Sequence, residues 1–186
     1  MTGERSRVFV GVPLPEEVLP FVEETQAALP DHADMRVTRA EQLHLTLCFL
    51  GEVEATKVER AVRVVSAVPC TMGGVVLLGG YVCLPSEARA RVVALDVDDP
   101  KGVLTALFER VASGMEREGV FQREGRPFRP HLTIARLGRP GRLRPTSDVR
   151  RIPLGIRSVC LYRSILSREG ARYEALQSAA LIDRSG

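Results

Sequence analysis

The chain has 186 residues, of which 45% are hydrophobic and 26% are charged, and its formal net charge is +3 at pH 7. This length is enough to bury a sizeable core, and the composition excludes fibrous and disordered proteins. No apolar run approaches the length of a membrane-spanning helix, and the mild positive charge permits a phosphate-bearing partner without demanding one.

The first third of the chain predicts two strands and a helix ahead of its main motif. Residues 7–13 are rich in Val and Phe and end in prolines, which is typical of a strand. Residues 15–29 predict an amphipathic helix, and a short strand is expected near residues 35–38. The helix stripe consists of Val18, Val22, Thr25 and Leu29.

An eight-residue phrase then begins at His44 and occurs again at His131. The copies read HLTLCFLG (44–51) and HLTIARLG (131–138), so that five positions are identical and one exchanges Leu for Ile. The chain has only three histidines, and two of them occupy the same place in the phrase. This match is too specific to be accidental, and we interpret it as an internal duplication.

Alternation predicts that each copy is a half-buried strand. In the first copy Leu45, Leu47 and Phe49 should face the core, and His44 and Thr46 should share the other face. We expect Gly51 to end this strand. The second copy places His131 and Thr133 together in the same way.

The segments after the first copy predict further strands and helices. Gly79 and Gly80 suggest a bend within one strand. A turn at residues 168–170 is expected to join the last two strands. The expected elements are a helix over 54–68, strands over 71–84 and 91–97, a helix begun by Asp98 or Asp99 with a stripe of Leu104, Leu107, Val111 and Met115, a loop over 139–151, and strands over 154–166 and 172–182.

The duplication extends beyond the phrase, because a strand, a helix and a connection precede each copy. We therefore predict one domain over residues 1–186, built from two lobes related by a pseudo-two-fold axis. Such an axis brings equivalent strands together, and His44 and His131 would then face each other.

Two opposed histidines suit general acid-base catalysis. With an ordinary pKa of about 6.5, one imidazole can accept a proton while the other, protonated, donates one. The hydroxyls of Thr46 and Thr133 can donate hydrogen bonds to phosphoryl oxygens. Together these groups suffice for cleavage of a phosphodiester without a metal or cofactor.

Other interpretations stay open at this point. A metal site is the rival chemistry, but zinc requires three or four ligands and no carboxylate lies beside either histidine in the sequence. Cys48 shares the His44 face by parity and is expected to fill the cleft floor rather than act as a nucleophile. The duplicated strands can also be purely structural, and His32 is expected at the surface.

Residues 123–151 carry nine arginines against Glu124 and Asp148, a local excess of seven positive charges. This stretch is either a rim that faces nucleic acid or a solvated surface. Arg136 lies five residues after His131, so strict alternation turns it away from the cleft unless the strand bulges. The candidates for stacking on a base are the aromatic residues Phe9, Phe49, Tyr81, Phe128, Tyr162 and Tyr173.

The four cysteines form no C-x-x-C pair, so we expect free thiols in the reducing cytoplasm. The polar start and the short apolar run behind it do not resemble a signal peptide. The cysteines are Cys48, Cys70, Cys83 and Cys160.

The sequence resembles the two-histidine (2H) phosphoesterase superfamily, and within it the LigT-like RNA 2′,3′-cyclic phosphodiesterases, also called 2′-5′ RNA ligases. The resemblance covers nearly the whole chain, and the doubled H-L-T motif is its most specific part. It is carried by RVFV (7–10) with Pro13, HLTLxFLG (44–51), PFxPHLTI (127–134) with Arg136, LYxS (161–164) and GxxY (170–173).

The resemblance implies a bilobal α+β fold in which antiparallel sheets line a central cleft and helices lie outside. It implies hydrolysis of a terminal 2′,3′-cyclic phosphate on RNA to a 2′-phosphomonoester. We expect a monomer that needs no cofactor. His44 would be the proton donor and His131 the acceptor, and Thr46, Thr133 and Arg136 would hold the phosphate. The alternatives are action on 2′-5′-linked oligonucleotides or another cyclic nucleotide, and a non-catalytic module that binds RNA ends.

Overall fold

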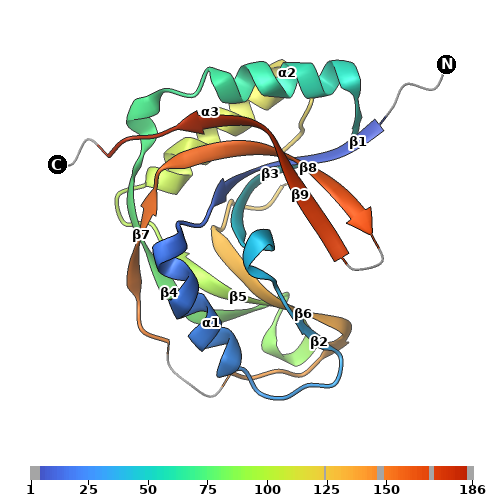
Figure 1. The fold of residues 1–186 in the computed structure, drawn as a ribbon, viewed down its shortest axis with the longest axis vertical. Helices are drawn as coiled ribbons and strands as arrows, with labels where there is room; N and C mark the ends of the chain where they lie inside the picture. The colour runs from blue at the N-terminus through green and yellow to red at the C-terminus, as the bar shows by residue number, and fades with distance from the viewer. Residues whose placement is uncertain (1–4, 124, 146–148, 168–169, 184–186) are drawn as a thin grey trace.

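The structure is a computed structural model that describes residues 5–123, 125–145, 149–167 and 170–183. Its strands are β1 (Arg5–Pro13), β2 (Met35–Val37), β3 (His44–Glu54), β4 (Gly74–Leu84), β5 (Ala90–Asp98), β6 (His131–Gly141), β7 (Ile152–Ile156), β8 (Ser158–Ser167) and β9 (Gly170–Ala180). Within the described residues they form one curled antiparallel sheet in the order β7-β4-β5-β6-β3-β1-β8-β9, with β2 paired to β6 (Figure 1).

Three α-helices in the described part of the chain lie on the outside of the sheet (Figure 1). They are α1 (Leu19–Ala27), α2 (Ala55–Ser66) and α3 (Val103–Arg117). The predicted stripe of α3 is fully buried, and Asp99 caps this helix by accepting hydrogen bonds from the backbone N–H groups of Val103 and Thr105. Contacts join α1 to β6, α3 to β3, and α2 to β8 and β9. The predicted α+β class with outer helices is confirmed.

The sheet has the predicted pseudo-two-fold arrangement. From the centre outward one half runs β3-β1-β8-β9 and the other β6-β5-β4-β7. Their registers match: Gly11, Val12 and Pro13 lie opposite Thr46, Leu45 and His44, while Ala94, Leu95 and Asp96 lie opposite Thr133, Leu132 and His131. Pairing of β3 with β6 joins the antiparallel sheets of the two lobes into one continuous sheet.

Two element boundaries differ from the predictions for reasons of backbone chemistry. The helix expected over residues 15–29 is a 3₁₀ turn over Glu16–Val18 followed by α1, because Pro20 has no N–H and is accommodated in a first helical turn. Gly51 does not end β3. With a φ of 73° it permits an irregularity in the pairing with β1, and the strand continues to Glu54.

The strand expected over residues 154–166 is two strands. β7 pairs with β4 in one half, β8 pairs with β1 in the other, and Arg157 lies between them. The chain therefore crosses between the halves within the stretch that was expected to be one strand. The bend predicted at Gly79-Gly80 is confirmed as a register shift in β4, whereas part of the expected turn, residues 168–169, lies outside the described residues.

The core fills the space between sheet and helices with aliphatic side chains, among them Leu45, Leu95, Leu107, Leu132 and Ile134. None of the helices in the described residues is long and apolar enough to span a membrane.

Leu132 offers a test of this packing, because its side chain is 0% exposed where the two halves meet. We expect Leu132→Ala to lower the free energy of unfolding in urea by about 2–5 kcal/mol, since it removes buried methyl groups and leaves a cavity. Leu166→Ala is the control, because Leu166 is 66% exposed. Equal losses for both variants would contradict the assignment of Leu132 to the core.

Candidate active site

The two repeated strands, β3 and β6, lie side by side with Leu45 opposite Leu132. In an antiparallel pair this register places His44 opposite Thr133 and Thr46 opposite His131. The leucines are buried, and the histidines and threonines are half-buried. The structure thus brings the four repeated polar residues together, with each imidazole across from the threonine of the other copy.

Both histidines are oriented by the same backbone interaction. Nδ1 of His44 lies 2.7 Å from the carbonyl oxygen of Gln42, and Nδ1 of His131 lies 2.9 Å from that of Arg129. Because a carbonyl only accepts, each Nδ1 carries a proton and donates it. Nε2 is therefore the nitrogen left to exchange protons in both rings.

An aromatic group surrounds His44. Its ring centroid lies 4.6 Å from that of Phe9, 5.1 Å from that of Tyr173 and 6.4 Å from that of Tyr162. On the neighbouring strand Gly11 supplies the remaining space, because a Cβ there would lie only 3.2 Å from Cδ2 of His44 and 2.9 Å from the carbonyl oxygen of Leu45. Ring contacts therefore position the imidazole, and the absence of a side chain at Gly11 leaves room for it.

These surroundings lower the pKa of His44 below its ordinary value. Burial is the largest cause, and the hydrogen bond to Gln42 opposes it. The positive charges of Arg136 and His131 lower this pKa further. In the free protein the environment therefore favours the neutral form of His44.

The surroundings of His131 are different although the strands are equivalent. Its partner on β5 is Asp96, where the partner of His44 on β1 is Pro13. Asp96 forms ion pairs with Arg129 at 3.5 Å and Arg151 at 3.7 Å. One histidine of the pair is thus packed by aromatic rings and the other lies beside charged groups.

A bulge in each strand overturns strict alternation. In β6 the pairing with β5 skips Ile134, so that Ile134 and Ala135 are both buried and Arg136 is exposed. The condition under which Arg136 was expected to reach the cleft is therefore met, and it lies among the residues that line the cleft.

The equivalent bulge in β3 corrects two predictions. The pairing with β1 skips Leu47, so that Cys48 is buried and Phe49 is 51% exposed, with the guanidinium of Arg7 5.0 Å from its ring centroid. Phe49 therefore does not face the core. Cys48 lies in the core rather than on the cleft floor, and burial raises the pKa of its thiol to about 12. An undissociated thiol is a poor nucleophile.

The cleft has a volume of about 980 Å³. His44, Thr46, Thr133 and Arg136 contribute to its lining, while His131 is not among the lining residues. One wall consists of residues 33–39, and the other includes Tyr173 at the β8–β9 hairpin. In Figure 1 the first wall is found at β2 and the second at the neighbouring ends of β8 and β9.

The sequence did not reveal the wall formed by residues 33–39, which brings Arg36 and Arg39 to the cleft. It also missed Gln42, whose carbonyl binds His44 and whose amide donates to the carbonyl of Ala171. The only sign of these residues in the sequence is that they lie close to the first motif. The sequence does not show that β2 pairs with β6, because the paired residues are about a hundred positions apart.

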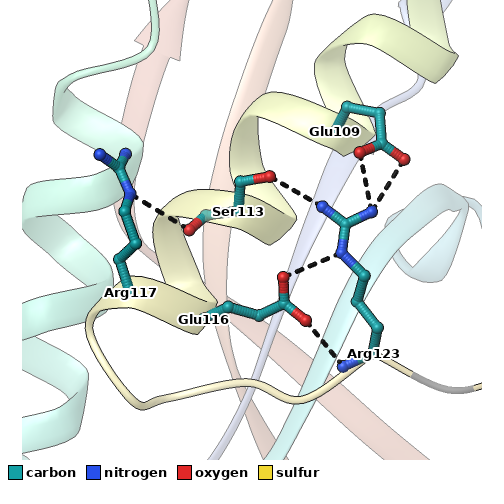
Figure 2. A network of polar contacts seen from close by, with 5 residues as sticks. All are labelled: Glu109, Ser113, Glu116, Arg117 and Arg123. Carbon is teal, nitrogen blue, oxygen red and sulfur yellow. Dashed lines mark hydrogen bonds and ion pairs between the residues drawn. The ribbon is translucent and has the colours of Figure 1, made fainter.

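The arginine-rich stretch is divided among several surfaces. Arg123 donates to the carboxylates of Glu109 and Glu116 and to Ser113 on α3, in the network of Figure 2. Arg129 and Arg151 pair with Asp96, and Arg144 lies 3.9 Å from Glu87. These contacts favour the solvated surface over a nucleic-acid rim, with Arg136 as the member that lines the cleft. Glu124 and Asp148 lie outside the described residues.

The remaining candidates are also placed. Across the described part of the chain, no group of three or more His, Cys, Asp or Glu side chains is arranged to hold a metal ion. His32 lies in the connection between α1 and β2, where Nδ1 accepts a hydrogen bond from the backbone of Asp34. Phe128 stacks on Phe108, and Tyr81 donates to the carbonyl of Thr25, so neither lines the cleft.

The chain is similar to a family of phosphoesterases and to several of its named relatives. The family model described as LigT like Phosphoesterase matches residues 12–94 and 95–173. The RNA 2′,3′-cyclic phosphodiesterase of Escherichia coli (strain K12) is 32% identical over 191 residues, covering 96% of this chain and 98% of that protein. The protein of the same name from Archaeoglobus fulgidus is 28% identical, covering 92% of this chain and 98% of its own.

Solved structures with similar sequences share the fold. A Thermus thermophilus protein, TT0787, superposes with a TM-score of 0.84 at 26% identity, covering 96% of this chain and 99% of that one. Escherichia coli LigT complexed with 3′-AMP gives a TM-score of 0.76 at 27% identity, covering 97% of this chain and 100% of that one.

The packing of His44 predicts its titration. We expect NMR to show its ring titrating below about 6.5, the ordinary histidine value, and Tyr173→Ala to shift that titration back upward because water reaches the ring. The folded protein then binds this proton less tightly than the unfolded chain does. The stability linked to His44 is present above a pH of about 6.5 and is lost as the pH falls toward the folded pKa. Titration at or above the ordinary value would contradict this account.

Proposed function

The chain belongs to the LigT-like phosphoesterase family, and from that premise we propose that it hydrolyses RNA 2′,3′-cyclic phosphate ends to 2′-phosphomonoesters. The observation that carries the proposal is the pair of strands in which each histidine, fixed through Nδ1, lies opposite a threonine. The names and the nearly full coverage of the relatives support the same reaction.

The reaction needs one proton taken and one given. His131 accepts the proton of a water molecule through Nε2, and the water oxygen attacks phosphorus. The bond between phosphorus and the 3′ oxygen breaks, and Nε2 of His44 gives its proton to that oxygen. The 2′ oxygen keeps the phosphate. The two histidines leave the cycle with their protons exchanged, and a second transfer through water restores them.

Thr46, Thr133 and Arg136 would bind the phosphoryl oxygens. Hydroxyl donors and a guanidinium suit the charge that develops on these oxygens in the transition state. This proposed role is supported by the placement of all three residues, with His44, on the lining of the cleft. The histidines and these three residues require no metal ion, so we propose a metal-independent hydrolysis with no cofactor.

The donor role of His44 follows the family resemblance, and its environment bears on it in two ways. A lowered pKa makes the protonated ring a stronger acid, which helps a poor leaving group. The same lowered pKa reduces the protonated fraction in the free protein, and this would suit a base. A bound phosphate anion beside the ring raises the pKa again and so favours the protonated form in the complex.

We also propose that residues 1–186 act as one domain, as a monomer in the cytoplasm. The sheet continues through both halves, which supports a single domain. All four cysteines are free, as is usual for proteins of a reducing compartment.

Removal of either histidine should abolish most of the hydrolysis of a short RNA that ends in a 2′,3′-cyclic phosphate. We expect His44→Ala and His131→Ala each to lower kcat by about 10²-fold or more, since each loses a general acid or base. His32→Ala is the control and should retain activity. The assay runs in EDTA from about pH 5 to 9, where a bell-shaped profile is expected. Losses below about tenfold at both sites, or activity that zinc restores, would contradict the proposal.

The two roles are separated by a substrate whose 3′ leaving oxygen is replaced by sulfur. Sulfur leaves without prior protonation, so the substitution should restore much of the activity of the variant that lacks the acid and little in the one that lacks the base. We expect rescue of His44→Ala. Rescue of His131→Ala instead would reverse the assignment.

A further inference from the structure

The cleft extends well beyond the residues proposed to act on the cyclic phosphate. Its volume of about 980 Å³ is near the upper end for small-ligand pockets, roughly 300–1,000 Å³. The proposed phosphate-binding side chains come from β3 and β6, whereas residues 33–39 form a separate wall with no role in the reaction.

Two arginines occupy directly opposite positions on neighbouring strands where this wall joins the site. Arg36 on β2 pairs in register with Arg136 on β6, and both residues are exposed and line the cleft. Like charges directly opposite in a sheet destabilise it. Within the described residues neither arginine has a carboxylate at ion-pair distance, whereas Arg39 lies 4.0 Å from Glu41. The arrangement favours a bound anion beside each guanidinium.

The wall that carries Arg36 is held in place by hydrogen bonds on either side. The amide of Gln26 on α1 donates to the carbonyls of Thr38 and Ile134, at 2.7 and 2.8 Å. The backbone N–H of Gly138 donates to the carbonyl of Asp34 at 2.9 Å. Arg36 is therefore mounted on a braced strand, which reduces the ordering that a ligand must impose.

We propose that Arg36 binds the phosphodiester that joins the terminal nucleotide of the RNA to the one before it. This inference rests on the proposed function, since it takes the group at Arg136 to be the cyclic phosphate. A neighbouring phosphate of the same chain is the anion that an RNA substrate supplies at a second, adjacent guanidinium. Asp34 in the same wall would repel a phosphate placed near it, so the chain is directed toward Arg36.

The consequence is a preference for RNA substrates of two or more nucleotides. A nucleoside 2′,3′-cyclic phosphate has no second phosphate and gains nothing from Arg36, whereas a dinucleotide that ends in a cyclic phosphate does. The contribution of Arg36 to affinity should be largest at low salt. Each phosphate of a single strand that is neutralised makes the logarithm of the binding constant fall more steeply with the logarithm of the salt concentration, by about 0.7 in slope.

The experiment compares kcat/KM for adenosine 2′,3′-cyclic phosphate and for an adenosine dinucleotide with a cyclic end, in the wild type and in Arg36→Ala. We expect no change with the mononucleotide and a loss of about tenfold with the dinucleotide, as for one charge-assisted hydrogen bond, with a flatter salt slope. Arg36→Lys should retain part of the preference. Arg60→Ala is the matched control, because Arg60 is an exposed arginine on α2 that binds the carbonyl of Glu118.

Equal losses with both substrates, or no loss with either, would overturn the second-phosphate site. Binding separates this outcome from failure of the proposed function. Fluorescence titrations with a 2′-phosphorylated nucleoside and the matching dinucleotide require no turnover. If no substrate is hydrolysed, a selective loss of dinucleotide binding in Arg36→Ala still supports the site, and equal binding by the variant and the wild type refutes it.

Discussion

The pairing of β3 with β6 is the contact on which the site depends, because it joins two sheets that each belong to one copy of the duplication. With Leu45 opposite Leu132, the side chains on either side of that pair are set across from each other, His against Thr and Thr against His. A slip of one residue would turn the side chains of the strand that slips to the other face. The buried leucines at the junction therefore maintain the alignment of the polar residues as well as the core.

Duplication gives two equivalent strands but not two equivalent sites. The ring of His44 is enclosed by Phe9, Tyr162 and Tyr173, and burial lowers its pKa. The strand next to His131 supplies Asp96 instead. The proposed acid-base reaction gives the two histidines different roles, and the neighbours of the repeated strands give them different surroundings while the strands themselves stay alike.

Both repeated strands have a bulge at the equivalent position, but the side chain that the bulge turns outward differs between them. Each repeated strand buries two consecutive residues after its threonine, and the next side chain is turned outward. In β6 that side chain is Arg136, which lines the cleft, and in β3 it is Phe49, which is half exposed under Arg7. Opposite Arg136 the β2 wall adds Arg36, so two arginines in register line the cleft.

The sequence by itself determined the duplication, the class of fold, the strands that carry His44 and His131, and the buried stripe of α3, because these depend on local periodicity and on a repeated motif. It did not reveal the outward turn of Phe49 or the burial of Cys48, since a bulge depends on the partner strand. It also did not reveal the crossing at Arg157 or the wall that presents Arg36. Those features arise from pairing between segments far apart in the chain, and only the tertiary structure decides which segments meet.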